Sequence, residues 1–313
     1  MKILITGANG QLGKCIRDIS NHYPEYNFLF LGRKELDIVN KEAIRVLFDK
    51  EEFDYCVNTA AYTNVEKAES EKEKAFLVNE DGVKNLAKQC KKNNTTLIQI
   101  STDYVFDGKK RAPYTEKDPT NPVNVYGASK LEGEKVLQEI WRKHYIIRTS
   151  WLYSQYGQNF YNMILRFVKE GKSLTVTTEQ TGTPTNANDL AEVILNIIAS
   201  DSKKYGIYNY SNEGEATWYD FAKEILTQTG QLTQTNLVKT DYYRTFAQRP
   251  VFSVLDARKY FSKFNYKSIE WQKSLKNLGN YFNFEPLVNQ RYLKIIVPAM
   301  FAKKTALLVL HSY

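Results

Sequence analysis

Tyr126 and Lys130 are the two residues whose types and spacing most directly suggest chemistry. They stand four positions apart, so on a helix they would lie on one face, one turn above the other. A phenol titrates near ~10, and an ammonium ~4 Å away could favour the phenolate by up to ~4 kcal/mol, roughly three pKa units. The pair would then act as an acid or base at neutral pH. The same spacing also occurs by chance, and the alternative is a solvated helix face.

Two neighbouring segments are expected to position this pair. Residues 123–142 carry it and show the apolar stripe of a helix, formed by Leu131, Val136, Leu137 and Ile140. A strand predicted at 95–100 delivers Thr102 to its carboxyl end, the edge where open α/β sheets place their sites. The Thr102 hydroxyl could hydrogen-bond a substrate carbonyl and share its proton with Tyr126. The alternative for Thr102 is a strand-end cap.

The N-terminus combines a short apolar strand at 3–6, three glycines in the pattern G-x-x-G-x-x-G (Gly7, Gly10, Gly13) and a following helix. Glycines let backbone amides approach a pyrophosphate, whose charge the N-terminus of a helix favours. The alternative is an ordinary strand–turn–helix with convenient glycines. The order of strand, glycines and helix at the start of the chain favours a dinucleotide-binding loop.

The next strand, at 28–31, ends close to Arg33 and Asp37. Arg33 lies twenty residues beyond Gly13, where a carboxylate holds the ribose of NAD and an arginine meets the 2′-phosphate of NADP. We therefore predict that NADP(H) is accepted. Asp37 is near enough to contact the adenosine half, so NAD(H) is not excluded. The alternative for Arg33 is a solvated loop cation.

The order of the elements predicts the fold class. Strands at 3–6, 28–31, 55–58, 95–100 and 144–148 alternate with helices, one of them over 65–92, and this favours a Rossmann-type doubly wound parallel sheet of the α/β class. Small residues after the third strand (59–61) would let backbone lie against a cofactor.

Beyond residue 150 the pattern changes, and a smaller α/β lobe is expected to bind the substrate. We assign 1–150, with about 189–210, to the NAD(P)-binding domain, 151–188 and 211–286 to the lobe, and 287–313 to a tail of unassigned role. Asp189 is predicted to cap a helix running to Ala199, and Thr217 to cap the next one. The aromatic residues 218, 219 and 221 are expected in the core of the lobe rather than at a ligand.

Composition limits the remaining classes. The chain has 313 residues with 42% hydrophobic and 25% charged content, as in ordinary globular proteins. Its net charge of +8 suits an anionic small ligand, and no motif supports nucleic acid binding. The three cysteines are widely spaced and no secretory signal opens the chain, which favours free thiols in the cytoplasm. No apolar run reaches the ~20 residues of a membrane span.

Taken together, these motifs resemble the extended short-chain dehydrogenase/reductase family. The glycine loop 7–13, the wall 58–61, Thr102 and the Tyr126/Lys130 pair occupy that family's motif positions. Longer blocks resemble one branch, the dTDP-4-dehydrorhamnose reductases. They are the segments 7–13, 101–108, 126–134 and 148–153, and the Arg249-Pro250 pair followed by Ser253. The resemblance covers residues 1–285, and several blocks in the same order are more specific than any one of them.

The resemblance implies NADPH-dependent reduction of the 4-keto group of dTDP-4-dehydro-β-L-rhamnose to dTDP-L-rhamnose, a nucleotide sugar used for cell-surface polysaccharide. Tyr126 would protonate the developing alkoxide, Lys130 would lower its pKa and hold the nicotinamide ribose, and Thr102 would hydrogen-bond the carbonyl. Implied cofactor contacts are Gly7, Asn9, Gly10, Gln11, Leu12, Gly13, Arg33, Asp37, Ile38, Ala60, Ala61, Tyr62, Asn79, Tyr126 and Lys130. Implied substrate contacts are Thr102, Asp103, Tyr104 and Trp151.

Arg249 is a further candidate, because a guanidinium meets phosphate oxygens in pairs and could hold the substrate diphosphate. An interlobe salt bridge is the equal alternative. Some members of the branch dimerise around magnesium through a carboxylate that is Cys15 here, so no metal is carried over. The tail from Leu287 matches nothing in the family; packing on the sheet or a subunit contact, as in a homodimer, is favoured over association with a membrane surface.

Two rival functions stay open. The regulatory β subunit of methionine adenosyltransferase resembles this branch and keeps much of the cofactor cleft while serving chiefly as a binding partner. Another nucleotide-sugar reductase or epimerase of the same fold is the second rival, and an epimerase would need no added NADPH. The presence of both Tyr126 and Lys130 and the reductase-like block 148–153 favour the reductase.

Overall fold

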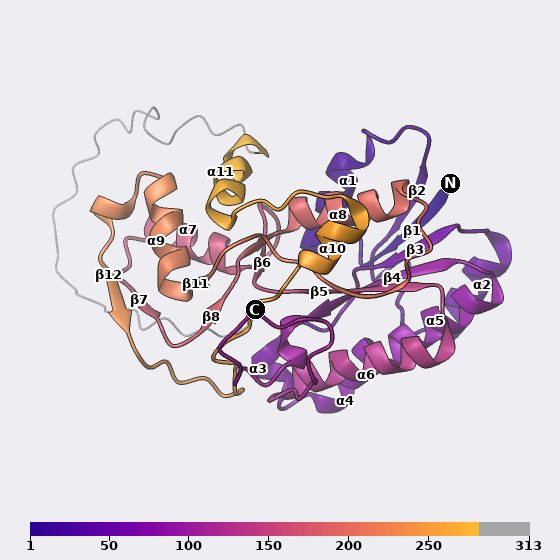
Figure 1. Cartoon of the computed structure of the whole chain (residues 1–313), viewed down its shortest axis with the longest axis horizontal. Helices are drawn as coiled ribbons and strands as arrows, with labels where there is room; N and C mark the ends of the chain where they lie inside the picture. The colour runs from indigo at the N-terminus through magenta and orange to yellow at the C-terminus, as the bar shows by residue number, and fades with distance from the viewer. Residues whose placement is uncertain (282–313) are drawn as a thin grey trace.

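A six-stranded parallel sheet forms the larger part of the molecule, in the computed structural model that describes residues 1–281 (Figure 1). Its strand order is β10-β5-β4-β3-β1-β2, and every neighbouring pair is parallel. The strands are β1 (Lys2–Thr6), β2 (Asn27–Leu31), β3 (Tyr55–Asn58), β4 (Thr96–Thr102), β5 (His144–Thr149) and β10 (Gly206–Asn209). The predicted Rossmann-type fold is confirmed.

Helices cover both faces of this sheet because both faces of its strands are apolar. Successive side chains of a strand point to opposite faces. Ile3 and Ile5 of β1 accordingly join one core, and Leu4 joins another. The first core lies under α1 (Gln11–Ser20), α8 (Ala187–Ala199) and α10 (Arg258–Phe264), and the second under α2 (Lys41–Lys50), α5 (Gly82–Lys92) and α6 (Val125–Ile140).

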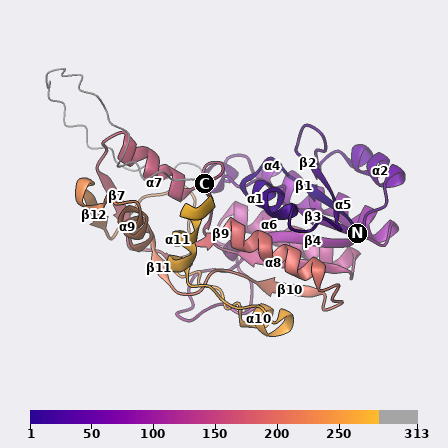
Figure 2. The same cartoon turned by 90° about the horizontal axis from the view of Figure 1, so that it is seen from above.

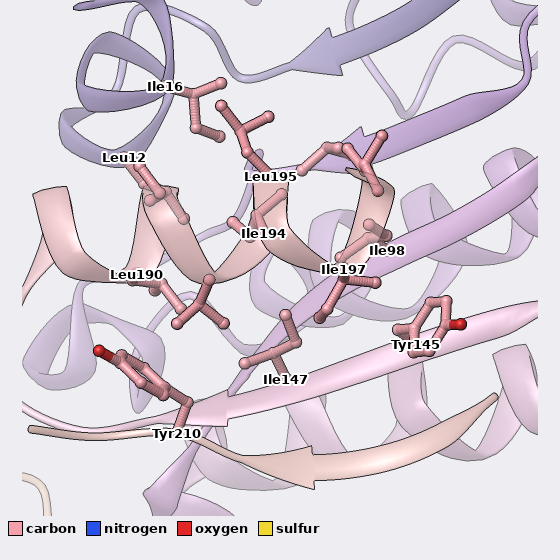
Figure 3. Packing of buried hydrophobic residues seen from close by; sticks show 14 of the residues in the cluster. Leu12, Ile16, Ile98, Tyr145, Ile147, Leu190, Ile194, Leu195, Ile197 and Tyr210 are labelled. Atoms are coloured by element: carbon pink, nitrogen blue, oxygen red, sulfur yellow. The ribbon is translucent and has the colours of Figure 1, made fainter. Parts of the chain in front are cut away.

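Helix α8 shows how closely the first core is packed. Figure 3 shows Leu190 and Ile194 of this helix on the side that faces the strands, with Ile147 of β5 below them. All three side chains are fully buried. Thus a segment from the second half of the chain packs on the N-terminal sheet, and β10 then joins its edge next to β5.

The segment 65–92 departs from the single helix predicted for it. It forms α3 (Val65–Ala68), α4 (Lys72–Phe76), one turn of π-helix η1 (Leu77–Asp81) and α5. The residues between α3 and α4 include Glu69, whose carboxylate accepts a hydrogen bond from the backbone N–H of Val125, the first residue of α6, at 2.8 Å. Apolar periodicity does not register such a polar break, so the prediction of one continuous helix was wrong.

The remaining elements form a smaller lobe beside the sheet, as Figures 1 and 2 both show. Its core collects aromatic side chains such as Tyr153, Phe160 and Phe221. Its helices are α7 (Phe160–Lys169), α9 (Trp218–Gln228) and α11 (Trp271–Tyr281), with the 3-10 turn η3 (Leu232–Gln234). Its short strands pair as β11 (Ala216–Thr217) with β8 (Thr181–Gly182), β12 (Leu237–Thr240) with β7 (Leu174–Thr177), and β6 (Leu152–Tyr153) with β9 (Thr185–Asn186).

The two helix caps predicted in this half of the chain have different outcomes. Thr217 caps α9 in a capping box with Asp220, as predicted. Asp189 does not cap α8, because Asn186 does so by accepting from the backbone N–H of Asn188. Asp189 instead lies buried in the first turn of α8, where it accepts from the Asn212 side chain at 2.6 Å. The tail 287–313 lies outside the described residues.

Candidate functional site

A cavity of about 500 Å³ extends from the carboxyl ends of β1, β3, β4 and β5 to the smaller lobe. This is the size of a pocket for a small molecule or cofactor. It brings together most of the residues predicted to form the site. These are Asn9, Gly10, Gln11, Leu12, Ala60, Ala61, Thr102, Asp103, Tyr104, Tyr126, Lys130, Trp151 and Arg249.

The glycine loop between β1 and α1 is shaped for a close backbone approach. Gly7 has φ +64°, and a Cβ there would stand 2.5 Å from the backbone nitrogen of Ala60, so no other residue fits without a shift. Gly10 is the N-cap of α1, and no side chain caps this helix. The amides of its first turn therefore have no capping acceptor from the protein, an arrangement that suits a pyrophosphate.

Gln11 and Gly13 show how this loop is fixed. The Gln11 amide donates to the carbonyl of Leu152 at 3.3 Å, and its oxygen accepts from the Ser154 hydroxyl at 3.2 Å. These bonds tie the start of α1 to the β6 segment. A Cβ on Gly13 would meet Ala8 at 2.6 Å, so Gly13 serves the packing of the helix against the preceding turn rather than lining the cavity.

Three further predicted cofactor residues, Ile38, Tyr62 and Asn79, do not line the cavity. Asn79 is buried and bonds both backbone atoms of Tyr62, at 2.9 and 3.0 Å, as well as the Ser129 hydroxyl at 2.9 Å. Ile38 is buried in the core, where it contacts Gly82. For Asn79, Tyr62 and Ile38 the structure thus shows packing roles, and their contacts to a cofactor stay predictions.

Arg33 and Asp37 stand at the end of β2, outside the cavity lining. The Arg33 side chain is 73% exposed, and its Nε donates to a carboxylate oxygen of Asp37 at 3.1 Å. A pair this exposed contributes little to stability, about 0–1 kcal/mol. Its guanidinium is therefore free to exchange this partner for an anionic one.

Thr102, Tyr126 and Lys130 meet in the cavity. Thr102 ends β4, and its hydroxyl accepts from the backbone N–H of Tyr104 at 3.1 Å, so the alternative of a strand-end cap also holds. The same hydroxyl hydrogen-bonds the Tyr126 phenol. Lys130 is buried, and its ammonium donates to the carbonyl of Ile100 at 2.6 Å. Two elements, β4 and α6, thus bring the three predicted catalytic side chains together.

The pKa shifts in this group differ from the expectation. Burial raises the pKa of Tyr126 above its ordinary value, and the Thr102 hydrogen bond only partly opposes this. Burial also lowers the pKa of Lys130 to about 8, against the attraction of Glu134. The expected lowering of the Tyr126 pKa by Lys130 is not seen in this structure, because loss of hydration raises that pKa and Lys130 is not among the groups that shift it.

Helix α6 is held rigidly where it carries the pair. Asn124 caps it by accepting from the N–H of Gly127 at 2.8 Å, and its amide donates to the carbonyl of Gln248 at 2.8 Å. Further along, Glu134 pairs with Arg148 of β5 at 2.6 Å, with both side chains almost fully buried. This ion pair fastens the helix to the strand next to β4.

Asp103 and Tyr104 follow Thr102 directly. Asp103 is buried, accepts from the Thr102 hydroxyl at 3.0 Å, and burial raises its pKa to about 7. Tyr104 packs edge-to-face on Tyr126, with ring centroids 5.8 Å apart. Both residues line the cavity, so a ligand beside Tyr126 would also lie close to them.

Arg249 lines the cavity, and it also forms the interlobe ion pair that the sequence offered as the alternative to a diphosphate contact. Its Nη2 donates to Glu66 of α3 at 2.9 Å, and both side chains are nearly buried, at 6% and 8% exposure. The other Glu66 oxygen accepts from the backbone N–H groups of Phe246 and Ala247 at 2.8 and 3.1 Å. The Nε of Arg249 is buried without a partner. The interlobe salt bridge exists, and a phosphate contact by Arg249 stays a prediction.

The structure adds residues that the sequence did not single out. Trp218 was expected in the core of the lobe alone, yet it both joins that core and lines the cavity, as does Phe160. Glu66 is the other addition, through its bonds to the segment that bears Arg249. The predicted cap at Thr217 placed Trp218 at the start of a helix. Nothing in the local sequence indicated that its ring lines the cavity.

Neither a metal site nor a membrane span is found in the described part of the chain. Within residues 1–281 no group of three or more His, Cys, Asp or Glu side chains could hold a metal ion. No helix in this range is both long and apolar enough to cross a bilayer. Cys15, at the position where some relatives place a carboxylate, is buried in the first core, and burial raises its thiol pKa to about 12.

Comparison with known proteins identifies the family. A family model described as "RmlD substrate binding domain" matches residues 1–283. A dTDP-4-dehydrorhamnose reductase of Aggregatibacter actinomycetemcomitans is 39% identical over 90% of this chain and 99% of its own. Crystal structures of such reductases from Clostridium acetobutylicum (37% identical) and, in complex with NADP, Bacillus anthracis (33%) each have a TM-score of 0.85 and match 90% of this chain and 99% of theirs. The chain therefore belongs to the dTDP-4-dehydrorhamnose reductase family, as its sequence motifs indicated.

Proposed function

We propose that this protein uses NADPH to reduce the 4-keto group of dTDP-4-dehydro-β-L-rhamnose, giving dTDP-L-rhamnose. One observation carries the proposal: Thr102, Tyr126 and Lys130 line the same cavity as the glycine loop at the start of α1. The names of the relatives and the NADP complex of the Bacillus anthracis enzyme support the choice of substrate and cofactor.

The residues present fit a dinucleotide. The uncapped first turn of α1 would hold the pyrophosphate, with Gly7 and Gly10 allowing its approach. Arg33, exposed at the end of β2, would meet the 2′-phosphate in exchange for Asp37. Ala60 and Ala61 would form the opposite wall. When bound there, NADPH supplies the hydride for the reduction.

Tyr126 is the proton donor in this proposal. Its raised pKa keeps the phenol protonated at neutral pH, which is the state that a reduction needs. As charge develops on the substrate oxygen, the phenol gives up its proton to it. Thr102, which lines the cavity beside Tyr126, would hydrogen-bond the same oxygen and so hold it beside the phenol.

Lys130 stabilises the phenolate that is left. Because its pKa is about 8, the Lys130 side chain is a charged ammonium in roughly nine molecules in ten at pH 7. The hydrogen bond from its ammonium to the Ile100 carbonyl fixes the Lys130 side chain near the end of β4. Its two further ammonium hydrogens can be donated to the nicotinamide ribose and to the phenolate oxygen that remains when Tyr126 has given up its proton.

The substrate would lie between the two lobes. Asp103 and Tyr104 line its path from the sheet side, Trp151 lines it from the lobe side, and Arg249 would meet the diphosphate. We place the reaction in the cytoplasm, in keeping with three free, buried cysteines.

The test is a coupled measurement of substrate and cofactor. Oxidation of NADPH is followed with dTDP-4-dehydrorhamnose, and with 4-keto nucleotide sugars of other ring stereochemistry as controls. We expect one NADPH consumed per dTDP-rhamnose formed, with the other sugars much slower. Turnover without net NADPH consumption would indicate an epimerase. A chain inert toward every sugar would refute the proposal and leave the regulatory subunit as the better reading.

A further inference from the structure

Two tryptophans form a stack on the lobe side of the cavity. The rings of Trp151 and Trp218 lie 3.6 Å apart with only 7° between their planes, and both line the cavity. Trp218 is 8% exposed and belongs to the core of the lobe, whereas Trp151 keeps a larger exposed fraction. The inner ring therefore supports an outer ring that faces the ligand space.

The backbone of Trp151 is held in an unfavourable conformation. Its φ is +44°, in the left-handed region that bulky residues rarely adopt. Such a conformation persists only where the surroundings fix it. Here the Trp151 carbonyl accepts from the N–H of Thr185 at 3.2 Å, and its ring is fixed by the stack.

The inner ring has its own supports. The indole N–H of Trp218 donates to the Gln180 side chain at 3.0 Å, and Phe160 packs against the ring with centroids 4.6 Å apart. Beside the stack, a Cβ at Gly182 would come within 2.6 Å of the Trp151 ring. The space for Trp151 is thus built by residues from α7, β8 and α9.

The register of the sheet places this stack near the reacting end of the cavity. Thr149, the last residue of β5, pairs with Thr102 on β4. Trp151 follows two residues later and lines the same cavity as Thr102, so we place its ring toward the reacting end of the ligand rather than toward the nucleobase. A flat apolar ring at this place fits the apolar face of a pyranose that carries a methyl group.

We propose that Trp218 is a positioning residue for the sugar: it holds the indole of strained Trp151 as a flat wall against the pyranose of the nucleotide sugar. The inference rests on the proposed function and adds to it a residue that acts through Trp151. It predicts that loss of the stack weakens recognition of the sugar and leaves the nucleotide and the cofactor bound as before.

The test compares ligands with and without the sugar. For Trp218→Leu we expect the KM for dTDP-4-dehydrorhamnose and the Kd for dTDP-rhamnose to rise about tenfold. The Kd values for dTDP and for NADPH, and kcat, should stay close to wild type. Trp218→Phe keeps an aromatic face and should restore most of the affinity. The far-UV circular dichroism couplet of two stacked indoles should be absent in both variants.

Controls make the result specific. Trp271→Phe changes a tryptophan that is 3% exposed in the same core but does not line the cavity, and it should alter none of these constants. Gly182→Ala places a methyl group against the Trp151 ring and leaves the Trp218 side chain unchanged, and it serves as the second variant if Trp218→Leu does not fold. If the substitution weakens the binding of dTDP and dTDP-rhamnose equally, or changes neither Kd, this inference is overturned while the proposed function stands. Wild-type protein that binds neither nucleotide refutes the proposed function and this inference with it.

Discussion

Glu66→Gln is the substitution that most sharply tests how the two lobes are joined at the cavity. The carboxylate accepts from Arg249 through one oxygen and from the N–H groups of Phe246 and Ala247 through the other. A glutamine can keep the two backbone bonds through its carbonyl. Its NH₂ group then faces the guanidinium, donor against donor, so the substitution removes the ion pair and little else.

The structure sets the expected magnitude. The two groups are 2.9 Å apart and each is less than a tenth exposed. With an effective dielectric constant of about 20, Coulomb's law gives roughly 6 kcal/mol for that separation. Breaking a buried pair typically costs about 3–5 kcal/mol, because one charge is left without a partner. We expect a loss in this range, a large part of the ~5–15 kcal/mol that stabilises a typical domain.

Urea unfolding measures this loss, with Glu132→Gln as the matched control. Glu132 pairs with Lys135 on the surface of α6, where both side chains are 40% or more exposed, so its substitution should cost under about 1 kcal/mol. The double variant Glu66→Gln/Arg249→Met removes both charges and should recover much of the stability. If Glu66→Gln costs no more than Glu132→Gln, the pair is not desolvated and the reasoning fails.

Four further predictions concern the reaction. Tyr126→Phe should keep NADPH affinity while kcat falls at least ~100-fold, the lower limit for loss of a general acid; a smaller fall in single turnovers would assign the proton elsewhere. Arg33→Ala should raise the KM for NADPH about 10- to 100-fold and leave the KM for NADH unchanged, and a parallel change in both would remove Arg33 from the 2′-phosphate. Burial lowers the pKa of Lys130 to about 8, so the ammonium predominates below that pH. We therefore expect kcat/KM to decline as pH rises through about 8. A Lys130→Arg variant that shows the same decline would exclude this assignment. Arg249→Ala should raise the KM for the nucleotide sugar with little change in kcat, and unchanged kinetics would end the diphosphate role.

The sequence by itself determined the sheet and its chemistry-bearing edge. Local patterns were sufficient because a parallel strand, a glycine loop and a helix can each be recognised from the periodicity or composition of about three to ten consecutive residues. Thr102 and Tyr126 could be placed at one edge because the carboxyl ends of parallel strands meet there. The reductase family also followed from the sequence, since its motif blocks lie in order along the chain.

Only the tertiary structure decided the surroundings of those residues. The pKa of Tyr126 rises instead of falling because packing removes part of the hydration of the phenol, and burial is a property of the packed molecule. The partner of Arg249 is Glu66, 183 residues earlier, and the stack of Trp151 on Trp218 joins segments 67 residues apart. Nothing in the local sequence encodes such distant contacts, because the first exists only where the smaller lobe packs against the sheet and the second only where two segments of the lobe pack together.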